Sequence, residues 1–113
     1  MNARQDAPAA QSKAAEKTRI VAQTPEVRVV EYVLGADDSL SWHFHSAVSD
    51  RFYCLEGLIS VEIRDPAQKI FLHPGETFAV PSGVVHRSRN AGNGISRYLL
   101  VQGVGRYDFV KAD

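Results

Sequence analysis

Residues 75–90 of the chain read GETFAVPSGVVHRSRN. Pro81 and Gly83 separate two short segments, 76–80 and 85–90, that contain no glycine or proline of their own. Proline lacks a backbone N–H and glycine adopts positive φ readily, so residues 81–83 are typical of a turn. Because short connections favour antiparallel neighbours, this stretch predicts two neighbouring antiparallel strands, with His86 near the start of the second.

Glycine and proline interrupt the rest of the chain in the same way, and this pattern predicts an all-β fold. From Ile20 onward, short segments rich in Val, Ile, Tyr and Phe are cut by Gly or Pro about every eight to twelve residues, as in sandwiches and barrels. Residues 58–63 alternate most clearly, with Ile59, Val61 and Ile63 on one face. We expect one antiparallel barrel or double-sheet jelly roll of about nine strands. They are predicted at 27–34, 40–45, 50–55, 58–64, 69–72, 76–80, 85–90, 95–101 and 106–110.

Two of the four histidines stand two residues apart, as His43-Phe44-His45. In a strand, such residues point to the same side and lie roughly 6.6 Å apart, so both rings can reach one metal ion. The pair alone does not decide this, since two histidines on one face also hydrogen-bond or face solvent. His86 follows about 40 residues later and supplies a third ring, which a folded sheet can bring to the pair.

Taken together, these stretches resemble the cupin superfamily. Residues 75–90 match the second cupin motif, G-x5-P-x-G-x2-H-x3-N, at all five fixed positions, and His43, His45 and Gly57 match the first, G-x5-H-x-H-x3-4-E-x6-G. The first motif departs twice: Asp50 stands in place of its Glu, and Gly35 precedes His43 by seven intervening residues instead of five. The resemblance covers residues 35–90, about half of the chain, and indicates a small single-domain cupin. The matching positions of the second motif are Gly75, Pro81, Gly83, His86 and Asn90.

The resemblance implies a cupin-type antiparallel β-barrel, a double-stranded β-helix or jelly roll, with one divalent transition metal inside. His43, His45 and His86 are the implied ligands, and the metal can be Fe, Mn, Co, Ni, Cu or Zn. Asp50 is a less certain fourth ligand, because it is one methylene shorter than Glu. We expect it to bind weakly, or to hold a metal-bound water and act as a general base. The alternative is an ion pair with a neighbouring arginine, Arg51 or Arg89.

Other residues near these motifs have simpler interpretations. His73 directly precedes Pro74-Gly75 in a turn, so we expect it at the surface. Asn90 and the glycines of the motifs are expected to set turn conformations.

Composition narrows the partners and the location. The 113 residues suit one domain, 19–113, after a flexible or peripheral tail of residues 1–18. The formal net charge is +0, so the chain as a whole has no electrostatic attraction that would favour binding to nucleic acid or anionic lipid. No apolar run approaches a membrane span, no secretory signal is visible, and Cys54 is the only cysteine. We therefore expect a cytoplasmic protein with a small-molecule ligand. A homodimer is expected because a small barrel exposes edges and an apolar outer face.

The predicted function is a metal-dependent enzyme acting on a small carbonyl, hydroxy-acid or enediol substrate. Its reaction would be of dioxygenase, isomerase or epimerase, decarboxylase or lyase type, which are reactions found among cupins. Fold resemblance does not choose among them. Two alternatives stay open: a non-catalytic cupin that binds or senses a sugar or small acid, and a barrel that the metal merely stabilises.

Overall fold

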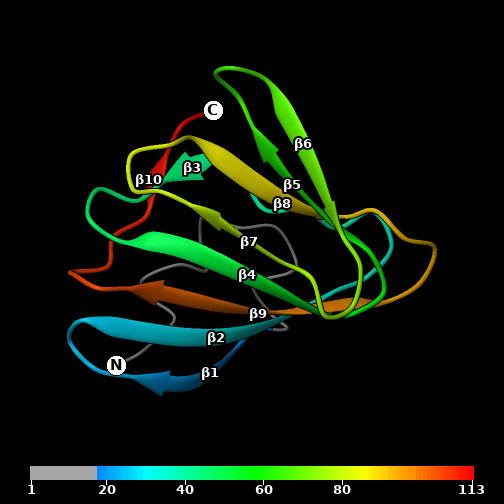
Figure 1. Ribbon diagram of the computed structural model, residues 1–113, viewed down its shortest axis with the longest axis horizontal. Coiled ribbons are helices and arrows are strands. Elements are labelled where there is room, and N and C mark those ends of the chain that lie inside the picture. Colours follow the sequence, from blue (N-terminus) through cyan, green and yellow to red (C-terminus); the bar gives the residue numbers. More distant parts are fainter. Residues whose placement is uncertain (1–17) are drawn as a thin grey trace.

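The computed structural model describes residues 18–113, which form ten strands in two antiparallel five-stranded sheets (Figure 1). The first sheet contains, in spatial order, β1 (Thr18–Gln23), β2 (Val27–Leu34), β9 (Ser96–Gly103), β4 (Ser49–Glu56) and β7 (Thr77–Val80). The second contains β10 (Val110–Lys111), β3 (His43–Phe44), β8 (His86–Asn90), β5 (Ile59–Ile63) and β6 (Gln68–Leu72). The all-β prediction is confirmed. In this described part of the chain, no helix has the length and apolar character needed to cross a membrane.

The two sheets pack as a jelly roll and do not close into a barrel. Strand pairing stays within each five-stranded sheet, and the outermost strands β7 and β10 have only four and two residues. Strands this short offer few backbone groups for joining one sheet to the other. The jelly-roll form of the prediction is therefore correct and the closed-barrel form is wrong. The turn at residues 81–83 carries the chain from β7 in one sheet to β8 in the other, so these consecutive strands do not pair with each other.

Alternating side chains place the core between the sheets. Along β2 and β9 every second residue is buried, as the period of two in a strand requires. Tyr32 and Tyr98 stack in the middle, with ring centroids 5.0 Å apart. The apolar core consists of Val30, Tyr32, Leu34, Leu40, Phe52, Cys54, Ile59, Val61, Leu72, Val80, Tyr98 and Leu100.

Most predicted strands agree with the observed ones within a few residues, but 40–45 shortens to the two residues of β3, 106–110 overlaps β10 (Val110–Lys111) only at Val110, and the N-terminal edge strand was missed. β1 was not predicted, because most of its side chains are exposed and show no apolar alternation. It forms by pairing with β2, and Arg19 adds an ion pair to Glu31 at 2.9 Å. Thr18, the last residue of the expected tail, begins this strand. The other residues of that tail, 1–17, lie outside the described residues.

Two motif residues hold the ends of the jelly roll in position. Gly83 has a φ of 82°, a conformation that favours glycine, and its N–H donates to the carbonyl of His45 at 2.8 Å. Asn90 accepts hydrogen bonds from Gly92 N–H and Ser96 Oγ, at 2.9 and 2.8 Å, and its amide nitrogen lies 2.7 Å from the carbonyl of Gly94. These contacts match the structural role expected of the motif glycines and Asn90.

Candidate metal centre

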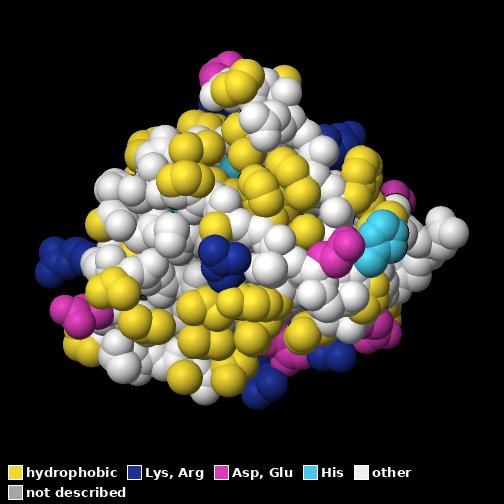
Figure 2. Space-filling model, viewed as in Figure 1, with side chains coloured by type: hydrophobic (Ala, Val, Ile, Leu, Met, Phe, Trp, Pro, Cys, Tyr) yellow, Lys and Arg dark blue, Asp and Glu magenta, His cyan; other side chains and the backbone are white. Residues whose placement is uncertain are grey.

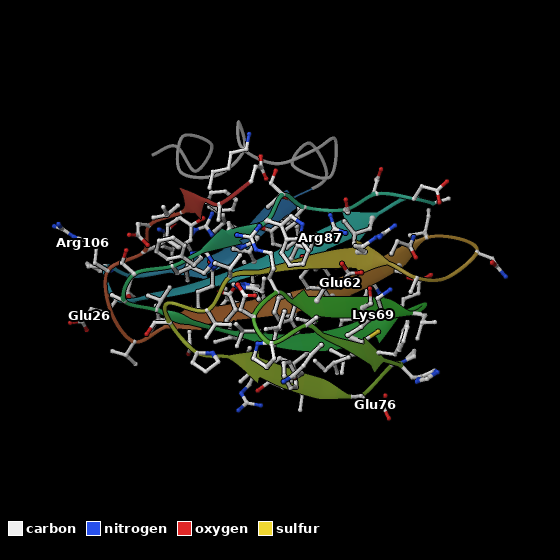
Figure 3. The ribbon with its side chains drawn as sticks, turned by 90° about the horizontal axis from the view of Figure 1, so that it is seen from above. Glu26, Glu62, Lys69, Glu76, Arg87 and Arg106 are labelled. Atoms are coloured by element: carbon white, nitrogen blue, oxygen red, sulfur yellow. The ribbon has the colours of Figure 1, made fainter. Side chains whose placement is uncertain are left out.

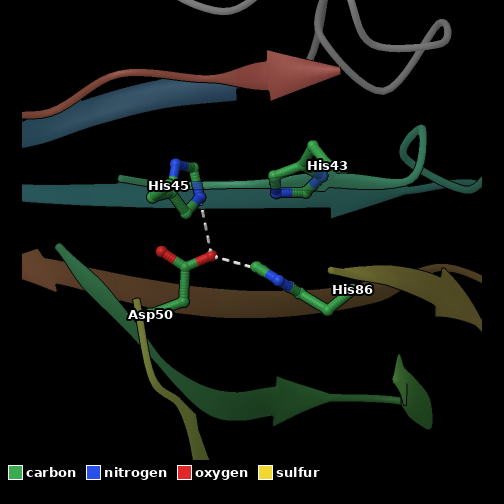
Figure 4. Close-up of side chains that lie close together, drawn as sticks. All are labelled: His43, His45, Asp50 and His86. Carbon is green, nitrogen blue, oxygen red and sulfur yellow. Dashed lines mark hydrogen bonds and ion pairs between the residues drawn. The ribbon is translucent and has the colours of Figure 1, made fainter. Parts of the chain in front are cut away.

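The fold brings all four candidate ligands to one point between the sheets. His43 in β3 pairs in register with His86 in β8, and His45 follows just after β3 on the same side. Asp50 comes from β4 in the opposite sheet. Each of the four residues can offer one ligand atom such that all these atoms lie within 4.8 Å of one another (Figure 4). All four side chains are buried, with at most 3% exposed.

Backbone carbonyls orient the three imidazoles. Nδ1 of His43 lies 2.7 Å from Ser41 O, Nδ1 of His86 lies 2.8 Å from Val84 O, and Nδ1 of His45 lies 2.5 Å from Asp108 O. A carbonyl oxygen can only accept, so Nδ1 carries the proton and donates in each ring. In a neutral ring this leaves the lone pair on Nε2. That tautomer is the one needed for metal binding through Nε2, and the carbonyls fix it as outer partners of metal-bound histidines usually do.

The contacts of Asp50 test whether the site suits a cation. Its Oδ2 lies 3.0 Å from Nε2 of His45 and 2.8 Å from Nε2 of His86. In the neutral tautomer, these are lone-pair atoms facing a carboxylate oxygen. Such close contacts require positive charge between them, supplied by protons in the metal-free protein or by a metal ion in their place. Three imidazole nitrogens and a carboxylate oxygen are a donor set that suits divalent transition metals, so the residues present fit such an ion.

Burial and the neighbouring charges shift the pKa values in this cluster. Burial and the adjacent ring of His86 lower the pKa of His43 to about 3, so His43 stays neutral at physiological pH. Burial opposes a charge on His45, but its hydrogen bond to Asp50 and the charge of that carboxylate raise the pKa of His45. Burial also opposes the ionised form of Asp50, yet hydrogen bonds with His45 and His86 hold its pKa well below the usual range. The free site therefore carries a carboxylate and at least one displaceable proton.

The remaining sequence candidates lie apart from this cluster. Arg51 donates to Thr77 Oγ1 at 3.3 Å, and Arg89 lies 3.7 Å from Glu62, so neither arginine pairs with Asp50 as the alternative interpretation required. The side chain of His73 is 68% exposed and contacts Glu76, as its turn position predicted.

Sequence reasoning missed two polar residues that support Asp50. Gln102 donates from Nε2 to Asp50 Oδ1 at 2.9 Å, and Arg28 Nη1 donates to Gln102 Oε1 at 2.7 Å. Both side chains are only 2% exposed. The available signal was parity: Gln102 continues the inward-facing series of Tyr98 and Leu100 along β9, and Arg28 does the same along β2. Burying a polar side chain in the core costs free energy unless the side chain is hydrogen-bonded, so a polar residue at such a position is a candidate member of a functional site.

Aromatic rings close the centre on the side of the C-terminal segment. Phe109 stacks on His43 with ring centroids 4.2 Å apart, and the ring of Tyr107 lies 5.4 Å from that of His45. The cavity left among these side chains is about 10 Å³, barely enough for one water molecule. The centre is thus dry and nearly closed.

Comparison with known proteins agrees with this geometry. The model of the cupin domain family matches residues 28–102, a range that includes all four clustered residues and leaves out β1 and β10. The chain belongs to the cupin family. A germin-like protein of Arabidopsis thaliana, subfamily 1 member 1, is 37% identical over 65 residues, covering 55% of this cupin but 30% of the plant protein. The cupin therefore spans less than a third of that relative's length.

Solved structures show the same fold at low identity. A double-stranded β-helix protein from Klebsiella pneumoniae superposes with a TM-score of 0.75 and 20% identity, covering 83% of this cupin and 81% of that chain. The polyketide cyclase RemF from Streptomyces resistomycificus superposes with a TM-score of 0.73 and 21% identity, covering 85% and 70%. These similarities establish the cupin jelly-roll fold. The activity has to be inferred from the residues of the site.

Proposed function

We propose that this cupin binds one divalent transition metal through His43, His45 and His86 and acts as a metal-dependent enzyme on a small carbonyl, hydroxy-acid or enediol compound. The observation that carries the proposal is the approach of Nε2 of His45 and of His86 to one oxygen of Asp50. A bound metal would supply Lewis acidity toward a substrate oxygen or a bound water. The identity of the metal and the reaction type are part of the proposal.

Asp50 is proposed as the group that holds and moves the proton. Gln102 fixes its Oδ1, while its Oδ2 faces the centre. Burial opposes the ionised form of this carboxylate, but its hydrogen bonds with the two histidines hold its pKa below the usual range, so it is ionised at neutral pH. This role requires that a metal ion replace the protons of those histidines, because the lowered pKa by itself makes Asp50 a weak base. The shorter reach of Asp, compared with the Glu of the motif, favours this role over tight metal ligation. Phe109 and Tyr107 help exclude water from the step.

A second candidate function is non-catalytic binding of a sugar or small acid. The observation that favours it is the cavity of about 10 Å³ at the centre, which leaves no room for a substrate directly beside the ligand atoms. The use of this fold by a polyketide cyclase supports catalysis only at the level of fold.

Metal analysis followed by a turnover assay tests the proposal. The full chain would be stripped with a chelator, loaded separately with Fe(II), Mn, Co, Ni, Cu or Zn, and titrated by calorimetry. We expect one metal per chain. Each loaded form would then be incubated with small carbonyl and hydroxy-acid compounds and examined for products by mass spectrometry. A product that disappears in Asp50→Asn supports the enzyme, and saturable binding without product supports the second candidate. Absence of stoichiometric metal binding rejects the metal-dependent proposal.

We also propose that two copies pair through the outer face of the first sheet. Figure 2 looks onto this face and shows hydrophobic side chains gathered over it. Tyr53 and Leu55, two large apolar side chains, are 38% and 42% exposed there. We define the face by its outward residues on three neighbouring strands, Val29, Val33, Leu99, Val101, Tyr53 and Leu55.

Charge distinguishes this face from that of the second sheet. Two-fold pairing brings the same patch of both copies together. On the first sheet, Arg19, Arg51 and Arg97 share the outer face with Glu31 and Glu56, and Arg97 pairs with both carboxylates at 2.5 and 2.8 Å. On the second, Glu62 alone faces Lys69, Arg87 and Arg89, and Figure 3 labels Glu62 between Arg87 and Lys69. The surplus of positive charge is larger on the second sheet, where it would repel the same face of another copy more strongly, so we propose that the dimer forms through the first sheet.

Light scattering tests the dimer. We expect about twice the chain mass of 12.5 kDa, and a monomer for Leu99→Glu, which places a charge in the apolar face. The matched control is Phe71→Glu on the second sheet, where the ring is already 50% exposed, and we expect it to stay dimeric. A monomeric wild-type chain, or dissociation by both variants alike, would overturn this interface.

A further inference from the structure

A cavity larger than that of the metal centre lies beside it. Its volume is about 180 Å³, and it opens between the β1–β2 turn and the loop that follows β9. Glu26 and Arg106 stand at this same end of the molecule in Figure 3. The floor of the cavity is formed by Arg28, Gln102 and Tyr107. For scale, a cavity of about 150 Å³ in another protein accommodates benzene, so this one suits a molecule of about six heavy atoms.

Gln102 and Tyr107 line this cavity and also line the small cavity at the metal centre. They are therefore the shared wall between the two. Since the centre itself has room for barely one water molecule, a substrate must lie mainly elsewhere. The larger cavity is suitably placed, because a molecule held there needs to pass only the amide of Gln102 and the ring of Tyr107 to reach the ligand atoms.

The charges of the lining favour an anion. The lining residues include two arginines, Arg28 and Arg106, and one carboxylate, that of Glu26. The guanidinium of Arg28 is buried, lies 4.2 Å from the centroid of the Tyr107 ring, and donates from Nη1 to Oε1 of Gln102, among its other contacts. A guanidinium has five N–H donors in a planar fork, so it can hold the amide of Gln102 and a ligand carboxylate together. Burial strengthens such charge-assisted hydrogen bonds.

The amide of Gln102 also sets the length of the ligand. It links Arg28 Nη1 to Asp50 Oδ1 through contacts of 2.7 and 2.9 Å. Adding the width of an amide group, these two atoms are at most about 8 Å apart. A molecule lying alongside this side chain, with one end on Arg28 and the other at the metal, is therefore short, about three to five carbons.

We propose that this cavity is the substrate pocket and that it binds a short carboxylic acid, with the carboxylate on Arg28 and a second oxygen directed past Gln102 toward the metal. The inference rests on the proposed function, which it narrows to small hydroxy or oxo acids. Gln102 then separates the two negative groups, the ligand carboxylate on Arg28 and the carboxylate of Asp50. Arg28 is a binding residue in this arrangement and does not take part in the proton transfer.

Calorimetry with the metal-loaded full chain tests the pocket, and lactate, pyruvate, lactamide and pyruvamide serve as probes. The amides match the acids in size but lack the charge. We expect millimolar binding of an acid and at least about tenfold weaker binding of its amide. Arg28→Met should weaken acid binding at least about tenfold while stoichiometric metal binding persists. Arg51→Met, which removes an arginine outside the pocket, should leave both unchanged.

A second variant keeps the test independent of the buried arginine. Gln23 is exposed at the rim of the cavity, so Gln23→Trp can block the entrance without disturbing the core. It should weaken acid binding to a similar extent. Equal binding of acids and amides, or acid binding unchanged in both Arg28→Met and Gln23→Trp, would overturn the pocket even when metal binds normally. Failure to bind metal is a different result: it rejects the proposed function, and acid binding to the metal-free chain then still decides the pocket.

Discussion

Nε2 of His86 lies 2.8 Å from Oδ2 of Asp50, although the two residues belong to opposite sheets. Each side chain is 1% exposed. Two buried polar groups on facing sheets must be satisfied by each other or by a shared ion, because burial removes most of their contact with solvent. The cluster of three histidines and Asp50 is thus also a connection between the sheets, so changes to it should affect stability as well as the proposed metal binding.

Removing the His86 ring should abolish most metal binding. His86→Ala leaves two imidazoles and deprives Asp50 of one of its two histidine contacts, so we expect a loss of affinity of at least about a hundredfold in a calorimetric titration. His73→Ala is the control, since that ring is exposed and contacts only Glu76. Equal loss of metal in both variants would contradict the assignment.

Substitution of Asp50 distinguishes a base from a ligand. Asp50→Asn keeps the size of the side chain but removes its charge and its basicity, so we expect affinity within about tenfold of the wild type and loss of any turnover. The affinity is measured by competition with a metal indicator. Loss of metal as complete as in His86→Ala would instead make Asp50 a direct ligand.

Metal affinity should weaken as the pH is lowered, and the weakening should begin at a pH above 6.5. The pKa of His45 is raised from 6.5, so below that raised value the metal must displace a proton from this ring, and the apparent affinity falls about tenfold per pH unit. His43, with a pKa of about 3, stays neutral, and Asp50, whose pKa is lowered, stays ionised through this range. Titrations between about pH 6 and 8 measure the slope, and a flat profile there would rule out proton release from His45.

Asn90 should contribute to stability without affecting metal affinity. Asn90→Ala removes the acceptor of Gly92 N–H and Ser96 Oγ in a buried position, so we expect a loss of about 2–3 kcal/mol in the free energy of unfolding. Urea denaturation measures it. Asn93→Ala, at a neighbouring exposed residue, should change stability by less than about 0.5 kcal/mol. An unaltered urea midpoint for Asn90→Ala would contradict the structural role of Asn90.

The predictable part of the molecule is the part that local rules determine. Proline, glycine and period-two alternation mark most strands, because backbone geometry acts within a few residues. The strand β1 was not predicted, because it forms by pairing with β2 and most of its side chains are exposed. For the same reason, sequence could not show that the turn around Gly83 passes between sheets: turn chemistry is local, whereas the partner of a strand is not.

The candidate site also has one part that the sequence identifies and another part that depends on which strands become neighbours. His43, His45 and His86 were identified by their match to the cupin motifs, and the structure places His43 opposite His86. Arg28 and Gln102 are 74 residues apart, and their hydrogen bond exists only because β2 and β9 are neighbours. Their inward parity was visible in the sequence, but parity does not say which distant residue a buried polar group will meet.

The short segment after β9 contributes no ligand, yet it supplies the carbonyl of Asp108 to His45 and the ring of Phe109 to His43. It lies outside both sequence motifs, so selection can vary it while the motif histidines stay fixed. Two cupins with identical motif residues can therefore differ in ligand basicity, solvent access and metal preference. For protein engineers, exchanging residues 107–109 offers a way to change the proposed metal site of this jelly roll without substituting any of the candidate ligands.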